Sequence, residues 1–244
     1  MTAAGRISPR SESLHERYDR DERALIDTAG VQLWTDHLLD AVIDVASPIM
    51  AGSSWDGLPD GAQPRTAERY TASSALMAMG LRAARTIALT VRAGYAPESL
   101  AGTRRLFEIA GHAQRVADDE TGQYADNWLR RRGNAAKPRA AFGDPETDTM
   151  WKIMSGHAHA EFDAYARQSA TLDGARVVHS IGPRRDGFWD DVALWFTARH
   201  LVRVLAAVLK VHPHIEQSDF LAVAGQVIEA EGRLEAEIAA RPVA

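Results

Sequence analysis

One segment near the C-terminal end constrains the fold of this chain more than any other. Residues 188–211 (FWDDVALWFTARHLVRVLAAVLKV) are apolar on almost every side of a helix. A helix without a polar face must be buried all round, inside either a protein or a membrane. Charged or ionisable residues interrupt this segment and argue against a membrane span, among them Asp190, Asp191, Arg199, His200 and Arg203. We therefore expect a central helix that other helices cover.

The covering helices are predicted from apolar positions at helical spacing in six further segments. These segments are residues 21–47, 66–92, 97–119, 122–132, 144–168 and 218–240. Residues 177–181 form a short strand or an extended segment. The sequence thus predicts an all-α, single-domain bundle of six to seven helices around residues 188–211. The domain spans residues 21–244 and follows a flexible tail of residues 1–20.

Local signals place the ends of several of these helices. Pro48 is expected to end the first helix and to open a long loop over residues 48–65. Gly94 suits the C-terminal cap of the second helix, and Pro97 with Glu98 suits the start of the third. Asp36, Asp40 and Asp44 recur at helical spacing in the first helix, where we expect them to form a solvated stripe.

Composition excludes several classes of function. The chain has 28 Lys and Arg against 33 Asp and Glu, a net charge of −5, which disfavours attraction to nucleic acid or an anionic membrane. It contains no cysteine, so thiolate catalysis, disulfides and zinc–thiolate sites are excluded. The N-terminal residues contain no apolar run typical of a signal peptide, and we expect a cytoplasmic protein.

Two pairs of histidine and glutamate suggest a metal site. Glu108 with His112, and His157 with Glu161, stand four residues apart, so each pair shares one face of a helix. If the two faces met, they would offer two imidazoles and two carboxylates to a divalent metal. Buried, hydrogen-bonded structural histidines are the interpretation that we favour, and we expect no cofactor.

Two stretches resemble a group of uncharacterised bacterial helical proteins. The stretches are RRLFE (104–108) and MWKIMSGH (150–157). The group carries an Arg-x-x-x-Glu helix and, later, a helix end with serine and histidine. The resemblance implies a helical fold and a polar cluster of Arg104, Glu108, Ser155 and His157. The spacing of Arg104 and Glu108 also fits an ordinary helix salt bridge, which is our preferred interpretation of that pair.

A second, more distant similarity is to the helical nucleotide-binding domains of bacterial toxin and defence systems. These domains carry an arginine, a polar residue and a histidine at a spacing that Arg105 and His112 match. In such a ribonuclease the histidine would act as general acid or base, and the arginine would stabilise phosphate charge. Leu106 stands where those domains carry the polar residue.

Two further features suggest partners. A basic loop suits an acidic or phosphorylated partner, although such loops are usually only solvated: Arg130, Arg131, Arg132, Lys137 and Arg139. The last predicted helix has an apolar seam of Phe220, Val227 and Leu234, which either packs on the bundle or forms a homodimer. We expect a homodimer.

These observations favour a binding or regulatory protein. In this hypothesis Glu108, His112 and His157 recognise a small ligand or a partner from the third and fifth predicted helices. The alternative is a metal-dependent or ribonucleolytic enzyme. Its catalytic residues would come from the same set: His112, His157, Glu108, Arg104 and Arg105.

Overall fold

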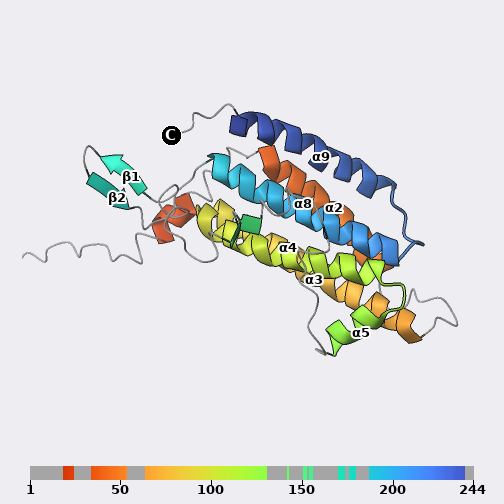
Figure 1. The fold of residues 1–244 in the computed structure, drawn as a ribbon. Coiled ribbons are helices and arrows are strands. Elements are labelled where there is room, and N and C mark those ends of the chain that lie inside the picture. Colours follow the sequence, from red (N-terminus) through yellow and green to blue (C-terminus); the bar gives the residue numbers. More distant parts are fainter. Residues whose placement is uncertain are drawn as a thin grey trace, which may run out of the picture.

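The computed structural model describes residues 19–24, 34–53, 64–130, 142, 151–152, 154–155, 170–173, 176–179 and 187–239. Helices dominate these residues and pack around one central helix, α8 (Gly187–Val211) (Figure 1). The predicted all-α class and the buried helix are therefore confirmed.

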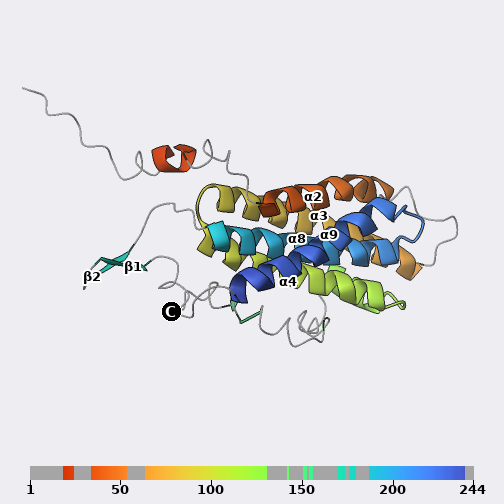
Figure 2. The ribbon, with the colours of Figure 1, turned by 90° about the horizontal axis from the view of Figure 1, so that it is seen from above.

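Helix α8 is covered by four other helices. These are α2 (Trp34–Gly52), α3 (Pro64–Arg92), α4 (Ala96–Asp118) and α9 (Ser218–Ala239). Helix α2 lies along one side of α8 and α4 along the other, and α9 runs diagonally across α8 (Figure 2). Helix α9 contacts both α8 and α2. By length and composition alone α8 could cross a membrane, but most of it is buried inside the bundle. This burial is typical of the core helix of a bundle.

The first helix departs from the prediction in two ways. Pro48 does not end it, because α2 continues to Gly52 and buries Ile49 in the core. Asp36 is not solvated, because it is buried and accepts hydrogen bonds from the Arg92 side chain of α3 at 3.2 and 3.3 Å. A proline inside a helix loses one backbone hydrogen bond, and the apolar burial beyond it compensates for that loss.

The turn between α3 and α4 forms as predicted. Gly94 has a φ of 87°, the left-handed conformation that glycine adopts without steric penalty. The amides of Gly94 and Tyr95 donate to the carbonyls of Val91 and Thr90 at 2.8 and 3.0 Å, which is a Schellman motif. Pro97 then lies in the first turn of α4. This tight turn sets α3 and α4 side by side.

A short helix, α5 (Gln123–Leu129), follows α4. The carboxylate of Asp119 accepts hydrogen bonds from the amides of Thr121 and Tyr124 at 3.0 and 2.6 Å, and so caps the start of α5. Arg69 of α3 donates to the carbonyl of Ala117 at 3.1 Å, where the carbonyls at the end of α4 lack partners within the helix. Side chains that lie outside the two helices therefore cap the end of α4 and the start of α5.

The remaining predicted segments are only partly described. Residues 19–24 are helical, so the predicted tail of residues 1–20 is at least two residues too long. Of the predicted helix 144–168, residues 151–152 and 154–155 are described, and they are helical. The strand expected near residue 177 pairs in a hairpin, in which β1 (Ala170–Asp173) runs antiparallel to β2 (Arg176–His179).

Candidate functional site

The polar cluster implied by the resemblance is partly assembled. Arg104 and Glu108 form the expected salt bridge, with 3.6 Å between Nε and Oε1. The guanidinium of Arg104 also lies over the ring of Trp151, 4.6 Å from its centre, and Trp151 contacts Phe107 in the core. The hydroxyl of Ser155 is buried and has no hydrogen-bond partner among the described residues. His157 lies outside the described residues, so its place in the cluster stays a prediction.

His112 pairs with α5. Its Nδ1 lies 2.8 Å from the Tyr124 hydroxyl, and its ring lies 6.3 Å from that of Trp128. Burial lowers the pKa of His112 below its ordinary value and raises the pKa of Tyr124. An imidazole in this setting is neutral at pH 7. The sequence suggested no contact between His112 and Tyr124.

The predicted metal set is described only at Glu108 and His112. His157 and Glu161 lie outside the described residues, and the metal site stays a prediction. Elsewhere in the described ranges, no three histidine or carboxylate side chains converge as metal ligands. Arg105, the second arginine of the ribonuclease hypothesis, is exposed on α4.

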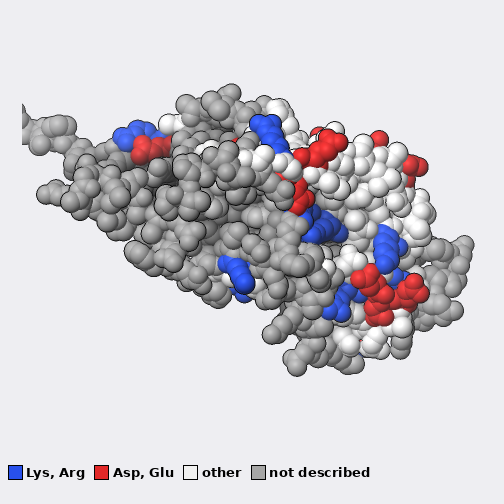
Figure 3. All heavy atoms as spheres, turned by 45° about the horizontal axis from the view of Figure 1, so that its top comes forward, with Lys and Arg blue, Asp and Glu red and all other residues white. Residues whose placement is uncertain are grey.

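The basic loop is described only at its first residue. Arg130 forms an ion pair with Asp126 one turn earlier in α5, so it is engaged within its own segment. Arg131, Arg132, Lys137 and Arg139 lie outside the described residues. On the face drawn in Figure 3, basic and acidic side chains of the described residues are interspersed and form no patch of one sign.

Two further histidines are fully buried. His200 of α8 lies edge-on to Phe107, with ring centres 5.1 Å apart, and neither of its ring nitrogens has a hydrogen-bond partner within the described part of the chain. Burial, and then the charges of Arg203 and Arg199, lower the pKa of His200 well below its ordinary value. His200 is therefore a neutral core residue.

His212 lies just after α8 and contacts α3. Its Nε2 is 2.9 Å from the hydroxyl of Ser73, a distance that would suit a nucleophile and its base. The Ser73 hydroxyl donates its single proton to the carbonyl of Tyr70 at 2.9 Å, so the imidazole must be the donor to Ser73. Both side chains are buried. The pair is a structural contact.

A groove that the sequence did not reveal runs between α2 and α3. At one end, Arg92 bridges Asp36 and Asp40 across the two helices. At the other end, the Ser74 hydroxyl of α3 donates to the carbonyl of Ser53 at 2.7 Å. Between the Arg92 ion pairs and the Ser74 hydrogen bond the two helices separate, and the groove has a volume of about 900 Å³.

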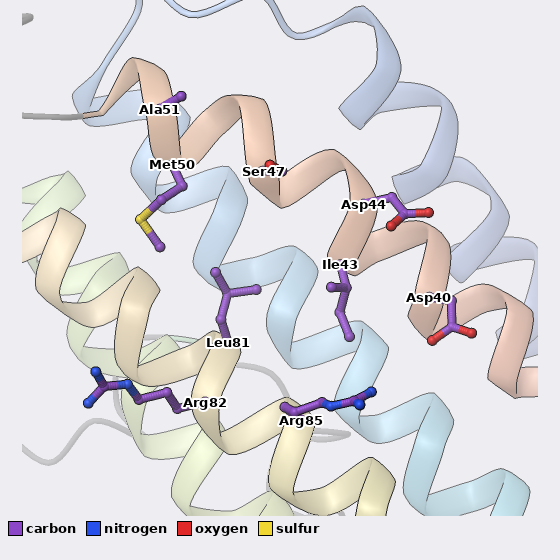
Figure 4. Close-up of a pocket in the computed structure, with 9 residues that line it drawn as sticks. All are labelled: Asp40, Ile43, Asp44, Ser47, Met50, Ala51, Leu81, Arg82 and Arg85. Atoms are coloured by element: carbon purple, nitrogen blue, oxygen red, sulfur yellow. The ribbon is translucent and has the colours of Figure 1, made fainter.

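The groove has an apolar centre and two rims of opposite charge. Ile43 and Met50 point from α2, and Leu81 points from α3, into the space between the helices (Figure 4). Small residues of α2, Ser47 and Ala51, complete that side of the groove. The rim on α2 carries Asp40 and Asp44, whereas the rim on α3 carries Arg82 and Arg85.

The charges on the rims are available to a ligand to different degrees. Asp44, Arg82 and Arg85 are exposed, and no ion pair engages them in the described part of the chain. Asp40 is shared with Arg92 at 3.5 Å. Two signals for this site were present in the sequence: acidic residues every fourth position in one helix, and arginines three apart in the next.

Comparison of the chain with protein-family models, curated proteins and solved structures found no match. The chemistry of the described residues is therefore the basis for assigning a function.

Proposed function

We propose that this protein is a binding or regulatory protein whose groove between α2 and α3 receives an amphipathic helix of a protein partner. The observation that carries the proposal is the groove itself, with its apolar centre and its two rims of opposite charge. Grooves of this kind bind helices through apolar side chains spaced along one helical face.

The dimensions of the groove suit a helix. Its lining runs from Asp40 to Ala51 on α2, about three helical turns or roughly 17 Å at 1.5 Å per residue. The centre offers partly buried apolar side chains that already pack on the core, so a ligand would bury a preformed apolar surface. A partner helix with two or three apolar side chains on one face matches this length.

The charged rims would set the direction of the bound helix. Basic side chains on one flank of the partner would meet Asp40 and Asp44, and acidic side chains on its other flank would meet Arg82 and Arg85. Reversing the helix in the groove would place like charges against each other. The rims therefore supply specificity, while the apolar centre supplies most of the affinity.

This proposal keeps the role expected from the sequence and adds a site. The cluster around Arg104, Glu108 and His112 stays a second predicted recognition site, because His157 lies outside the described residues. The groove is favoured because its charges are exposed, whereas Glu108 and His112 have partners within the chain. A cytoplasmic setting is part of the same proposal.

A designed peptide tests the proposal. The peptide is a helix of about four turns with a leucine face, lysines on one flank, glutamates on the other and a fluorophore at its N-terminus. We expect saturable binding to the full chain by fluorescence anisotropy, and no binding of a scrambled peptide without the apolar face. Quenching by a probe placed at the exposed position Ala51 reports the direction of the helix.

Matched variants locate the binding site. Leu81→Lys places a charge in the groove and should weaken binding at least about tenfold, as loss of a central apolar contact does. Leu89→Lys, at a half-exposed apolar position of α3 outside the groove lining, is the control and should bind normally. The double reversal Asp44→Lys with Arg82→Glu leaves one charge of each sign on both rims and should abolish the preference of the peptide for one direction. Equal binding by the two lysine variants, or no binding by the native chain, would refute the proposal.

A further inference from the structure

Helix α9 has two apolar faces, and the bundle uses only one of them. Phe220, Val227 and Leu234 are buried against the bundle, which resolves the question that the sequence left open about this seam. Leu221 and Ile228 point away from the bundle, with 61% and 68% of their surfaces exposed. They are the two most exposed large apolar side chains among the described residues. The outer face of α9 is therefore an apolar surface that no described residue covers.

Two glycines share this outer face. Gly225 and Gly232 lie with Leu221 and Ile228 within an arc of about 60° at 100° per residue. A Cβ added at either glycine would meet nothing within 4 Å, so both glycines border open space. The outer face thus alternates large and small residues in the order Leu221, Gly225, Ile228 and Gly232. This face is called the outer stripe below.

The outer stripe is complementary to itself in one orientation. When two α9 helices pair antiparallel about a two-fold axis midway between Gly225 and Ile228, Ile228 of each copy lies opposite Gly225 of the other. The same axis places Leu221 of each copy opposite Gly232 of the other. Each large side chain then fills the space above a glycine, and the helices can approach closely. A parallel pair would set leucine against leucine and glycine against glycine.

Charge is compatible with this pairing. An exposed charged residue that borders the outer stripe, Glu229, would lie level with Ala222 and Gln226 of the second copy. Both of those residues are exposed and uncharged. Uncharged residues therefore lie level with the Glu229 carboxylate of each copy, and no like charges of the described residues meet at the same level of this flank.

We propose that the chain forms an antiparallel homodimer through the outer stripe of α9. A contact made by one helix from each copy is smaller than the roughly 1,200 Å² that stable complexes bury. The dimer should therefore dissociate on dilution. This interface is independent of the groove between α2 and α3, so each proposal can fail without the other.

Sedimentation velocity of the full chain over a wide range of concentrations tests the dimer. We expect a monomer at low concentration and a dimer at high concentration. Ile228→Glu should remain monomeric throughout, and Leu89→Glu, at an exposed apolar position of α3, should dimerise like the native chain. Thermal unfolding of each variant establishes that it folds.

An exchange of large and small residues tests the orientation. Gly225→Ile alone should abolish the dimer, because the introduced isoleucine would meet Ile228 of the second copy. Gly225→Ile combined with Ile228→Gly restores one large and one small residue at the facing positions, and the dimer should return. A native chain that stays monomeric at every concentration, dimerisation of Ile228→Glu, or failure of the exchange to restore the dimer would each overturn the proposal.

Discussion

Helix α3 meets two of its neighbours, α4 and α2, in different ways. Its contact with α4 is closed, because Gly102 lets α4 approach Ile87 so nearly that an added Cβ would lie 3.1 Å from that side chain. Its contact with α2 is open, because their hydrogen bonds and ion pairs in the described residues lie at the two ends. Small and apolar residues therefore pack α3 closely against α4. Exposed charged residues border the contact between α3 and α2 and leave a groove there.

The largest expected effect is a difference in stability between truncating a leucine in the closed contact of α3 with α4 and truncating one in the open contact of α3 with α2. Leu106 of α4 is fully buried beside Gly80 of α3, whereas Leu81 lines the open groove and is only partly buried. Leu106→Ala should lower the free energy of unfolding by about 3–4 kcal/mol, because it leaves a cavity. Leu81→Ala should lower it by less than about half as much. Urea unfolding measures both values, and equal losses would mean that the groove is as well packed as the closed contact.

Acid should destabilise the protein through the histidine that packs on α3. Burial, and then the charge of His214, lower the pKa of His212 to about 4. The unfolded chain has the ordinary value near 6.5, so it binds the proton first as the pH falls. The stabilisation is complete above about pH 6.5 and is lost as the pH falls to about 4, a difference of roughly 3 kcal/mol.

A non-titrating variant separates this histidine from the others. His212→Gln keeps a side-chain donor for Ser73 and removes the proton-binding group. Urea unfolding at about pH 7 and about pH 4.5 should show a smaller loss of stability in the variant than in the native chain. His200 and His112 also have lowered pKa values, so part of the loss should persist. An unchanged loss in the variant would contradict the role given to His212.

A smaller effect on stability is expected at the ion pair between Arg92 and Asp36, which lies at one end of the groove. Arg92→Leu leaves the buried carboxylate of Asp36 without its guanidinium partner and should reduce stability by about 2 kcal/mol. The double variant Asp36→Leu with Arg92→Leu should recover most of this loss, because neither charge remains to be buried. A double-mutant cycle by urea unfolding measures the coupling, and additive losses would show that the two side chains act independently.

Most helices could be predicted from the sequence because their signals are local. The apolar periodicity of α3, α8 and α9 gave bounds within two residues of those observed. The Gly94 cap and the Pro97 start were correct for the same reason, since a turn depends on a few adjacent residues. The prediction that Pro48 ends the first helix was wrong, because burial of Ile49 in the core outweighed the cost of a proline inside a helix.

The candidate sites depended on distances that a sequence does not contain. Asp36 was predicted to be solvated because its partner, Arg92, stands 56 positions away on another helix. His112 was assigned to a cluster with His157, whereas its described partner is Tyr124. The groove follows from the separation of two helices along α8, which no periodicity encodes. Residue types could be predicted, but their partners could not.

The smallest expected effect is the change in stability on replacing a glycine by alanine, at Gly80 of α3 and at Gly102 of α4. A Cβ added at Gly80 would lie 3.5 Å from Val204 of α8, an ordinary contact. Gly80→Ala should therefore raise the free energy of unfolding by about 0.5–1 kcal/mol, because alanine loses less conformational entropy in a helix than glycine. Gly102→Ala gains the same entropy but must displace Ile87 in the closed contact of α3 with α4, so its net effect should be smaller or destabilising. Thermal and urea unfolding of both variants make the comparison. A larger gain at Gly102 than at Gly80 would show that the contact of α3 with α4 is looser than its geometry indicates.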